Sequence, residues 1–360
     1  MKIFLVSNLY PSKKFPNFGT FVAGFADAMQ KRGGEIVYKA VIDRKYTNKL
    51  KLLYAYIRLF INVLSNGLFK KYDVIYVHYI AHTALPVYIL SLFKRKPIIL
   101  NAHGDDILPR TKLVEYMQYM IKCLLPKVSL VVVPSLFFKD VFLNKFSFDE
   151  KKVYVYPSGG IDRTVFKKTA IEKKDLGFDN NDIILGFVSR IAGGKGWRLF
   201  IDAVMNIMDR KENLKGLMIG NGEEVEELKI YLQSNNLQEN IHFIENVNHM
   251  KLNDYYSIMD VFVFPTQLYE SLGLVGLEAM SCGTPVIASD IGGIKTYMKD
   301  GYNGYLFSPG DKKKLVSKIE KFLNLSAIEQ EEMKKNCVLT AERYESNSVT
   351  QELYLKLLSL

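Results

Sequence analysis

The feature that most constrains this fold is a series of short β-branched and aromatic runs separated by helix-length segments. Six runs lie in the first half of the chain, at residues 2–8, 35–42, 73–79, 97–103, 130–135 and 152–158. Six more lie in the second half, at 183–190, 215–222, 241–246, 261–266, 285–290 and 304–309. Runs that are apolar on both faces, with room for a crossover helix between them, are typical of buried parallel strands. The chain is therefore predicted to be an α/β protein with two doubly wound, Rossmann-like sheets of six strands, one in each half.

Length and local composition predict where the chain divides. With 360 residues and 48% hydrophobic content, the chain exceeds the size at which a single core usually splits. The boundary is predicted at SGGID, residues 158–162, where two glycines follow the last strand of the first half. The expected domains are 1–160 and 161–345, with a C-terminal helix at 346–360 that packs back on the N-terminal domain. Ligands of paired open α/β sheets lie beyond the carboxyl ends of the strands, so the expected site is a central cleft that the two domains face.

Charge and cysteine content narrow the class of protein. Residues 1–160 contain 24 Lys and Arg against 10 Asp and Glu, a net charge of +14, whereas the remainder has a net charge of −4. This asymmetry predicts that only the N-terminal half faces a polyanion or an anionic membrane. The three cysteines have neither the spacing of a disulfide framework nor that of a zinc site, which fits a reducing cytoplasm. The N-terminal apolar run is too short for a signal peptide, and no stretch has the roughly 18 uncharged apolar residues of a membrane span, so we expect neither export nor a bilayer crossing.

A basic and apolar segment stands out in the first half. Residues 44–71 contain seven Lys or Arg and no acidic residue. Between residues 50 and 64 nearly every position is apolar, apart from a narrow polar stripe that includes Lys51, Arg58 and Asn62. One interpretation is a helix that inserts shallowly into an anionic leaflet, and the other is a core helix packed within the domain. Nucleic acid is not an expected partner, because no recognised nucleic-acid module accompanies these residues.

A glycine-rich turn follows the first strand of the second half. The segment SRIAGGKGW, residues 189–197, joins a strand to a helix but contains neither GxGxxG nor GxxxxGK[ST]. Its two cations, Arg190 and Lys195, can converge on a phosphate at the helix N-terminus. The alternative is an ordinary glycine turn with two solvated cations.

Two glutamates, Glu270 and Glu278, lie eight positions apart after the predicted strand at 261–266. The residues from Ser271 to Leu274 are predicted to form a helix N-terminus, whose N–H groups favour an anionic ligand. Carboxylates on both sides of such a terminus fit a ligand with hydroxyls on both sides of a diphosphate, as in a nucleotide sugar. Alternatively, Glu270 only caps the helix.

The order and spacing of these segments resemble the retaining GT-B glycosyltransferases that carry the E-x7-E motif, known as glycosyltransferase family four, and in particular their polysaccharide-assembling members. In the second half the similar segments are YPSGGID (156–162), SRIAGGKGW, GNGEE (220–224), the glutamate pair and residues 283–307. In the first half they are the loop YPSKKFPNFGTF (10–21) and NAHGDD (101–106). The resemblance covers nearly the whole chain.

The resemblance implies a role for each candidate site residue. The C-terminal domain is expected to bind a UDP- or GDP-sugar, with Arg190 and Lys195 at the diphosphate. Glu270 is expected to bind the sugar, Glu278 the ribose, and His103 to approach the reacting sugar. The other implied donor contacts are Gly19, Asn246, Val247, Ser271, Leu272, Gly273 and Leu274, with backbone amides serving at Gly19 and at 271–274. His103 can also be a satisfied strand-end histidine, and no catalytic role is expected for the remaining histidines, His78, His82, His242 and His249.

The resemblance further implies the reaction. We expect retaining hexosyl transfer that needs neither a cofactor nor a metal, because two cations and a helix terminus can take the place of a divalent ion. The expected acceptor is a glycan or lipid-linked glycan of surface polysaccharide biosynthesis (capsule, exopolysaccharide or lipopolysaccharide). The enzyme is expected to be cytoplasmic and peripheral on the inner face of the cell membrane. A soluble transferase with a small-molecule acceptor and a non-catalytic nucleic-acid-binding protein are the alternatives.

Overall fold

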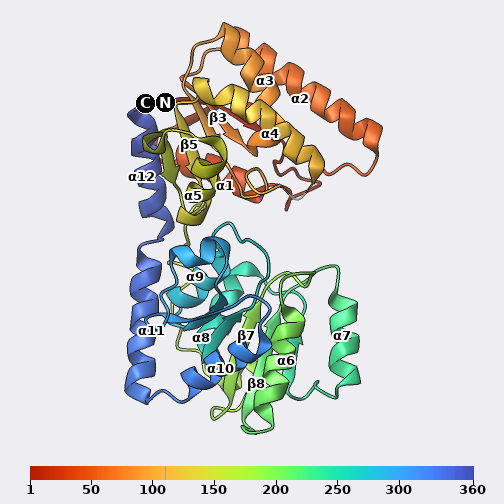
Figure 1. Ribbon diagram of the computed structural model, residues 1–360, viewed down its shortest axis with the longest axis vertical. Coiled ribbons are helices and arrows are strands. Elements are labelled where there is room, and N and C mark those ends of the chain that lie inside the picture. Colours follow the sequence, from red (N-terminus) through yellow and green to blue (C-terminus); the bar gives the residue numbers. More distant parts are fainter. Residues whose placement is uncertain (110) are drawn as a thin grey trace. The chain divides into compact units, whose positions relative to one another are not determined.

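The protein folds into two compact units. The computed structural model shown in Figure 1 describes residues 1–109 and 111–360. The first unit comprises Met1–Gly159 and Ser348–Leu360, and the second comprises Gly160–Asn347. Each unit contains one six-stranded sheet, with strand orders β2-β1-β3-β4-β5-β6 and β12-β11-β10-β7-β8-β9. All the strand pairs are parallel. The predicted fold class is therefore confirmed.

The first unit alternates strands and helices along the chain. Its strands are β1 (Lys2–Ser7), β2 (Glu35–Val41), β3 (Val74–His78), β4 (Ile98–Asn101), β5 (Leu130–Val133) and β6 (Val153–Val155). Its helices are α1 (Thr20–Gln30), α2 (Lys49–Phe69), α3 (Ile80–Phe93), α4 (Lys112–Leu124), α5 (Leu136–Phe146) and the returning α12 (Ser346–Leu358), with short 3-10 turns at Leu125–Lys127 and Glu150–Lys152.

Alternation along the strands divides the core of the first unit into two layers. Phe4 and Val6 of β1 point into the layer that α2, α3, α4 and α5 cover. Ile3 and Leu5 point into the opposite layer, which α1 and α12 cover. The sheet is thus buried on both faces, as is typical of a parallel sheet with crossover helices.

The second unit follows the same plan. Its strands are β7 (Ile183–Val188), β8 (Leu214–Ile219), β9 (Ile241–Ile244), β10 (Val261–Phe264), β11 (Val286–Ser289) and β12 (Gly304–Phe307). Its helices are α6 (Trp197–Met208), α7 (Val225–Ser234), α8 (Leu252–Ile258), α9 (Leu274–Ser281), α10 (Lys312–Leu323) and α11 (Ala327–Glu342), with 3-10 turns at Lys173–Leu176, His249–Lys251 and Gly292–Thr296. One core layer packs under α6, α7 and α10, and the other under α8, α9 and α11.

The helix α2 has one face in the core of the first unit and an opposite face that is exposed. It is 21 residues long, and by length and mean hydropathy alone it could cross a membrane, although Arg58 lies in the middle of its apolar run. Its buried residues, among them Leu59 and Val63, nevertheless pack into the core of the first unit. Its opposite side is exposed, with Leu50 at 77% and Tyr54 at 67% of their accessible surface, which excludes a helix buried within the domain.

Candidate functional site

In the second unit, the loops after β7 and β10 pack directly on each other at the carboxyl ends of these neighbouring strands. The backbone N–H of Gln267 donates to the carbonyl of Gly194 at 2.7 Å. A Cβ atom on Gly196 would lie 2.0 Å from the carbonyl oxygen of Pro265, so only glycine permits this approach. The parallel topology thus joins two loops that are some 70 residues apart in sequence, and α6 begins directly after Gly196.

This packing brings Lys195 to Glu270. The Lys195 Nζ lies 2.7 Å from the Glu270 Oε1, and the two side chains are only 18% and 16% exposed. The hydroxyl of Thr266 donates to the same carboxylate oxygen at 2.9 Å. Because Glu270 bonds to a cation from another loop, the alternative in which it only caps α9 is excluded. The ammonium has three donors, so one bond to Glu270 leaves it able to bind a phosphate as well.

The segment that leads into α9 is held by the backbone of the 3-10 turn at Gly292–Thr296. Gly293 donates its N–H to the carbonyl of Glu270 at 2.9 Å, and a Cβ atom on Gly293 would lie 2.1 Å from the carbonyl oxygen of Ser271. The residue before the helix is Gly273, which has no side chain to cap it. Leu272 is buried, so it can contact a ligand only through its backbone. These features leave the N-terminus of α9 suited to an anion.

Glu278 lies one turn into α9 and is 6% exposed. Its carboxylate accepts a hydrogen bond from the Tyr256 hydroxyl and contacts the His249 Nε2, each at 3.2 Å. The hydrogen bond to Glu278 raises the pKa of His249 above its ordinary value. The His249 side chain is 67% exposed, so a ligand that displaces it can donate hydrogen bonds from its hydroxyls to the buried carboxylate.

The remaining candidates in the second unit are more exposed. Arg190 follows β7, and its nearest carboxylate is that of Glu223, 4.0 Å away. Asn246 follows β9 and accepts a hydrogen bond from the Asn221 side chain at 3.0 Å. The neighbouring Val247 is half-buried against the layer under α8 and α9. These residues share the carboxyl edge of the sheet with Lys195 and Glu270.

In the first unit, the two candidates Gly19 and His103 also follow strands. Gly19 is the residue directly before α1, in the loop after β1. His103 lies in the loop after β4, where its ring packs on Phe21 with a centroid distance of 4.6 Å and on Tyr79 at 4.9 Å. Its Nε2 is 2.9 Å from the Nδ1 of His78. The structure therefore places the glycine loop and His103 at the same edge of this sheet.

Sequence reasoning missed the partners of the candidate residues, namely His78, Tyr256, Thr266 and His249. From sequence, Tyr256 is interpreted as an ordinary core residue and Thr266 as an ordinary residue at a strand end. Nothing in the local sequence indicates that they bond to the two glutamates. His78 had a usable signal, because β3 and β4 are consecutive and neighbouring strands usually pair, which places the residues that end them side by side.

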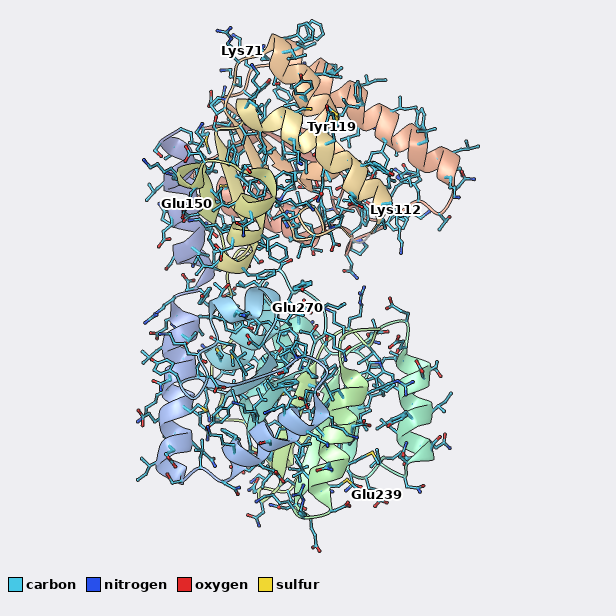
Figure 2. The ribbon with its side chains drawn as sticks, in the orientation of Figure 1. Lys71, Lys112, Tyr119, Glu150, Glu239 and Glu270 are labelled. Atoms are coloured by element: carbon cyan, nitrogen blue, oxygen red, sulfur yellow. The ribbon has the colours of Figure 1, made fainter. Side chains whose placement is uncertain are left out.

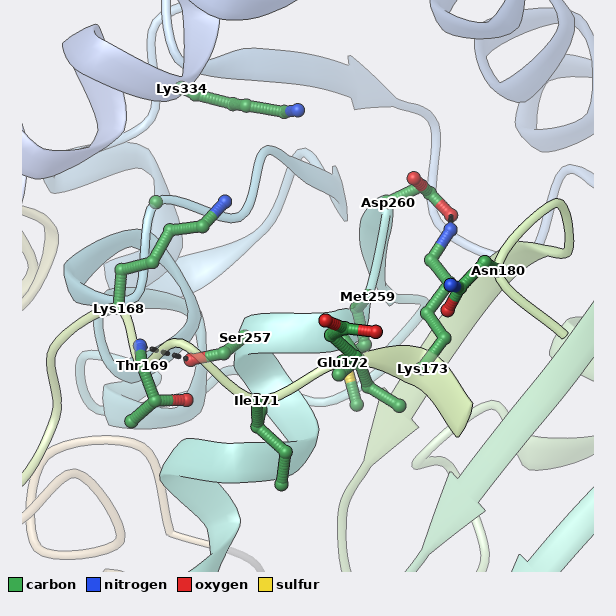
Figure 3. A pocket seen from close by; sticks show the side chains of 12 residues that line it. Lys168, Thr169, Ile171, Glu172, Lys173, Asn180, Ser257, Met259, Asp260 and Lys334 are labelled. Atoms are coloured by element: carbon green, nitrogen blue, oxygen red, sulfur yellow. Dashed lines mark hydrogen bonds and ion pairs between the residues drawn. The ribbon is translucent and has the colours of Figure 1, made fainter. Parts of the chain in front are cut away.

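A separate pocket of about 300 Å³ lies at the opposite edge of the second sheet (Figure 3). Its lining includes Asn180 and Asp260, which precede β7 and β10, and Asp260 pairs with Lys173 at 2.8 Å. Lys195 and Glu270 follow the same two strands. The pocket therefore does not belong to the candidate site.

The fold and these loops define a class of protein, the GT-B glycosyltransferases. Residues 19–162 match the family model described as Glycosyltransferase Family 4, and residues 168–338 match the one described as Glycosyl transferases group 1. Models of glycosyltransferases therefore match both halves of the chain.

Three relatives illustrate the similarity. An uncharacterized glycosyltransferase of Methanocaldococcus jannaschii is 26% identical over 71% of this chain and 67% of its own length. The capsular polysaccharide biosynthesis glycosyltransferase CapM of Staphylococcus aureus is 27% identical over 60% of this chain and 59% of its own length. Six further curated relatives are matched over between 36% and 64% of their length. HepE of Anabaena, solved in complex with UDP, superposes with a TM-score of 0.79 at 21% identity over 100% of both chains, which shows a shared fold.

Proposed function

We propose that the protein is a retaining glycosyltransferase that moves a sugar from a nucleoside-diphosphate sugar to a glycan or lipid-linked glycan of surface polysaccharide biosynthesis. The observation that carries this proposal is the Lys195–Glu270 pair beside the N-terminus of α9. The cation and the helix terminus suit a diphosphate, and the carboxylate suits sugar hydroxyls. CapM, whose name places it in capsular polysaccharide biosynthesis, supports the class of product. HepE, which has been solved with UDP-glucose, supports a UDP-sugar as donor.

The proposed donor site assigns one task to each group. Arg190, Lys195 and the backbone of residues 271–274 hold the diphosphate, and Glu270 holds hydroxyls of the transferred sugar. Glu278 accepts from the ribose, while Asn246 and Val247 border the base. The first unit binds the acceptor and contributes the Gly19 loop and His103.

The proposed transfer occurs on one face of the sugar. The bond from C1 to the phosphate oxygen breaks while the acceptor hydroxyl oxygen bonds to C1 on the same face, and the hydroxyl proton passes to the departing diphosphate oxygen. Lys195, Arg190 and the α9 terminus stabilise the charge that develops on this diphosphate. Because a fixed lysine, an arginine and backbone N–H groups supply this stabilisation, we propose that no divalent metal is required.

Retention gives the first test of this function. A panel of UDP- and GDP-sugars is screened by thermal shift, since a ligand that binds only the native state raises the melting temperature. NMR spectra of the product formed from the best α-linked donor should show an α-glycoside. If the enzyme only hydrolyses the donor, spectra recorded before mutarotation should show the α-anomer of the free sugar. A β-anomer would refute retention, and the absence of both a shift and turnover across the panel would refute the function.

The diphosphate contacts give a second test. Arg190→Ala and Lys195→Ala should each weaken binding of the donor or of UDP by roughly 10- to 100-fold, because each removes a charge-assisted hydrogen bond of about 1.5–3 kcal/mol. Titration calorimetry measures the affinity. Arg210→Ala is the matched control, since Arg210 follows the other end of α6 and pairs with Glu320. Unchanged affinity in both site variants would remove these residues from the donor site.

We also propose that the first unit docks on an anionic membrane on the cytoplasmic side. The exposed residues Leu50, Leu53, Tyr54, Ile57 and Ile61 recur on α2 at helical spacing and form one apolar stripe, which we call the α2 stripe. The stripe lies opposite the buried face, because Ile57 and Ile61 are each two positions, about 200°, from the buried Leu59 and Val63.

Charge and neighbouring helices support a lipid surface as the partner of the α2 stripe. Lys49, Lys51 and Arg58 surround the stripe, and residues 44–72 contain no acid. Helix α3 contacts both α2 and α4, and the three lie side by side on one face of the sheet (Figure 1). On α4, Leu113, Tyr116 and Tyr119 are also exposed, and Lys112 and Tyr119 both extend from this helix in Figure 2. Cations and tyrosines beside exposed aliphatic side chains suit the headgroup region of an anionic bilayer.

A further inference from the structure

The two histidines at the carboxyl edge of the first sheet form a direct pair. His78 is the last residue of β3 and is 1% exposed. His103 follows the neighbouring β4, and its Nε2 lies 2.9 Å from the His78 Nδ1. At this distance one nitrogen must donate a hydrogen and the other must accept it.

Both rings are uncharged near neutral pH. Burial lowers the pKa of His103 to about 3. Burial is also the larger cause of the pKa of His78 lying well below its ordinary value, and the nearby His103 ring is the smaller cause. Each ring therefore carries one proton, and two arrangements are possible. In one, the His78 Nδ1–H donates to His103. In the other, the His103 Nε2–H donates to His78, which then carries its own proton on Nε2.

The environment of the His78 Nε2 decides between these arrangements. This atom is buried and has no hydrogen-bond partner within the described part of the chain. The ring lies against Phe25 and Tyr76, with centroid distances of 4.9 and 5.1 Å. A buried N–H without an acceptor is rarer than a buried acceptor without a donor. His78 therefore keeps Nε2 unprotonated and donates from Nδ1.

The rest of the pocket fixes the His103 ring in place. Phe21 and Tyr79 pack on it, and its backbone N–H donates to the Asp106 carboxylate at 3.0 Å. Asp106 also accepts from the backbone N–H of Ala81 at 3.3 Å, which ties the His103 loop to the first turn of α3. Packing sets the orientation of the ring, and the hydrogen bond from His78 acts on its tautomer.

We propose that His78 is a positioning residue that locks His103 as the Nδ1–H tautomer, so that His103 meets its ligand as a neutral hydrogen-bond donor. The ligand this geometry suits is a hydroxyl or ring oxygen of a sugar, and the significance of that contact rests on the function proposed above. In this arrangement His103 moves no proton during the reaction. It is neither a general base, because His78 occupies its lone pair, nor a general acid, because it stays neutral.

Nitrogen NMR of the full chain tests the tautomer directly. The protein is labelled with ¹⁵N-histidine, and long-range ¹H–¹⁵N correlations are recorded at pH 7.5; the chain has only five histidines, so His103→Gln assigns the signal. We expect the His103 Nδ1 to be protonated and its Nε2 to be unprotonated and hydrogen-bonded. A wild-type spectrum with the proton on the His103 Nε2 would overturn the proposal, whatever the variants do.

Two substitutions at His78 separate positioning from simple packing. His78→Leu keeps an apolar side chain of similar size but removes the donor, and His103 should then populate the Nε2–H tautomer. His78→Asn restores an N–H near the position of Nδ1 and should restore the wild-type tautomer. A His103 tautomer that is unchanged in a folded His78→Leu variant would also overturn the proposal.

Kinetics link the tautomer to transfer. In His78→Leu, kcat/KM for transfer should fall about tenfold, the equivalent of one hydrogen bond, and His78→Asn should recover most of it. UDP affinity measured by calorimetry should stay unchanged, because the diphosphate residues lie in the second unit. If no nucleotide sugar supports transfer, the proposed function fails, whereas the spectra still decide the tautomer.

Discussion

Replacing Glu270 with glutamine should reduce turnover by about 100-fold, whereas Glu278→Gln should mainly weaken donor binding. Glu270 bonds to Lys195 at 2.7 Å and is proposed to hold the transferred sugar where charge develops during transfer. Loss of one such preorganised electrostatic contact typically costs on the order of 10²–10³ in kcat. Glu278 accepts from Tyr256 and is proposed to bind the ribose, which is remote from the bond that breaks.

Steady-state kinetics with the donor found by thermal shift compare the two variants. Glu278→Gln should raise the donor KM about tenfold and change kcat by less than about threefold, since its contact is the same in ground and transition states. Glutamine keeps the size of each side chain, so the pair is matched for packing. Circular dichroism checks the fold of Glu270→Gln, because that change leaves the poorly exposed Lys195 without its anionic partner. Equal losses of kcat would refute this division of labour.

Reversing the charge of Lys49, Lys51 and Arg58 should reduce binding to phosphatidylglycerol vesicles by about 100-fold or more. Each Lys or Arg near an anionic surface contributes about 1 kcal/mol, so three contribute about 3 kcal/mol, and reversal adds repulsion. The substituted side chains are exposed and lie away from the buried face of α2, so the fold should tolerate the change. Sedimentation with vesicles at about 0.05 M and 0.5 M salt measures the binding and its screening.

The control for this experiment is a variant with the same change in net charge in the second unit. Lys313, Lys314 and Lys335 are exposed residues of α10 and α11, and their reversal to glutamate should leave vesicle binding nearly unchanged. A second variant, Ile57→Ser with Ile61→Ser, tests insertion of the α2 stripe without altering charge. If vesicle binding is indifferent to lipid charge and to the three α2 substitutions, docking is refuted, and a soluble transferase with a small acceptor becomes the better explanation.

The sheets could be predicted from sequence because the signal is local. Each of the twelve apolar runs coincides with one strand, and runs such as LVVVPS owe this to β-branched residues that are buried on both faces. The ends of the strands were less well defined. The run at 97–103 becomes a strand only at Ile98–Asn101, so His103 lies in the loop that follows it.

The internal contacts of the candidate site could be predicted only in outline. Topology requires that the loops after neighbouring strands meet, which is how Lys195 reaches a residue 75 positions away. The partner of a buried carboxylate is decided by packing instead. The sequence around Tyr256 does not indicate that it bonds to Glu278, because an aromatic residue in an amphipathic segment is normally interpreted as a core residue. The exposure of the α2 stripe was likewise left open, since the sequence does not say which of two apolar helix faces the sheet covers.

The return of the chain into the first unit has a consequence for how this protein folds as the ribosome makes it. Val349, Leu353 and Leu357 of α12 complete the core layer formed by α1 and the first sheet, yet the ribosome makes them only after the whole of Gly160–Asn347. At 5–20 residues per second, this delay is on the order of 10–40 s. The second unit, which is continuous in sequence, can therefore reach its native state during elongation. The first unit must wait, with the sheet face of Ile3 and Leu5 covered only by α1, so nascent chains of this protein are expected to depend on chaperones at their N-terminal rather than their C-terminal half.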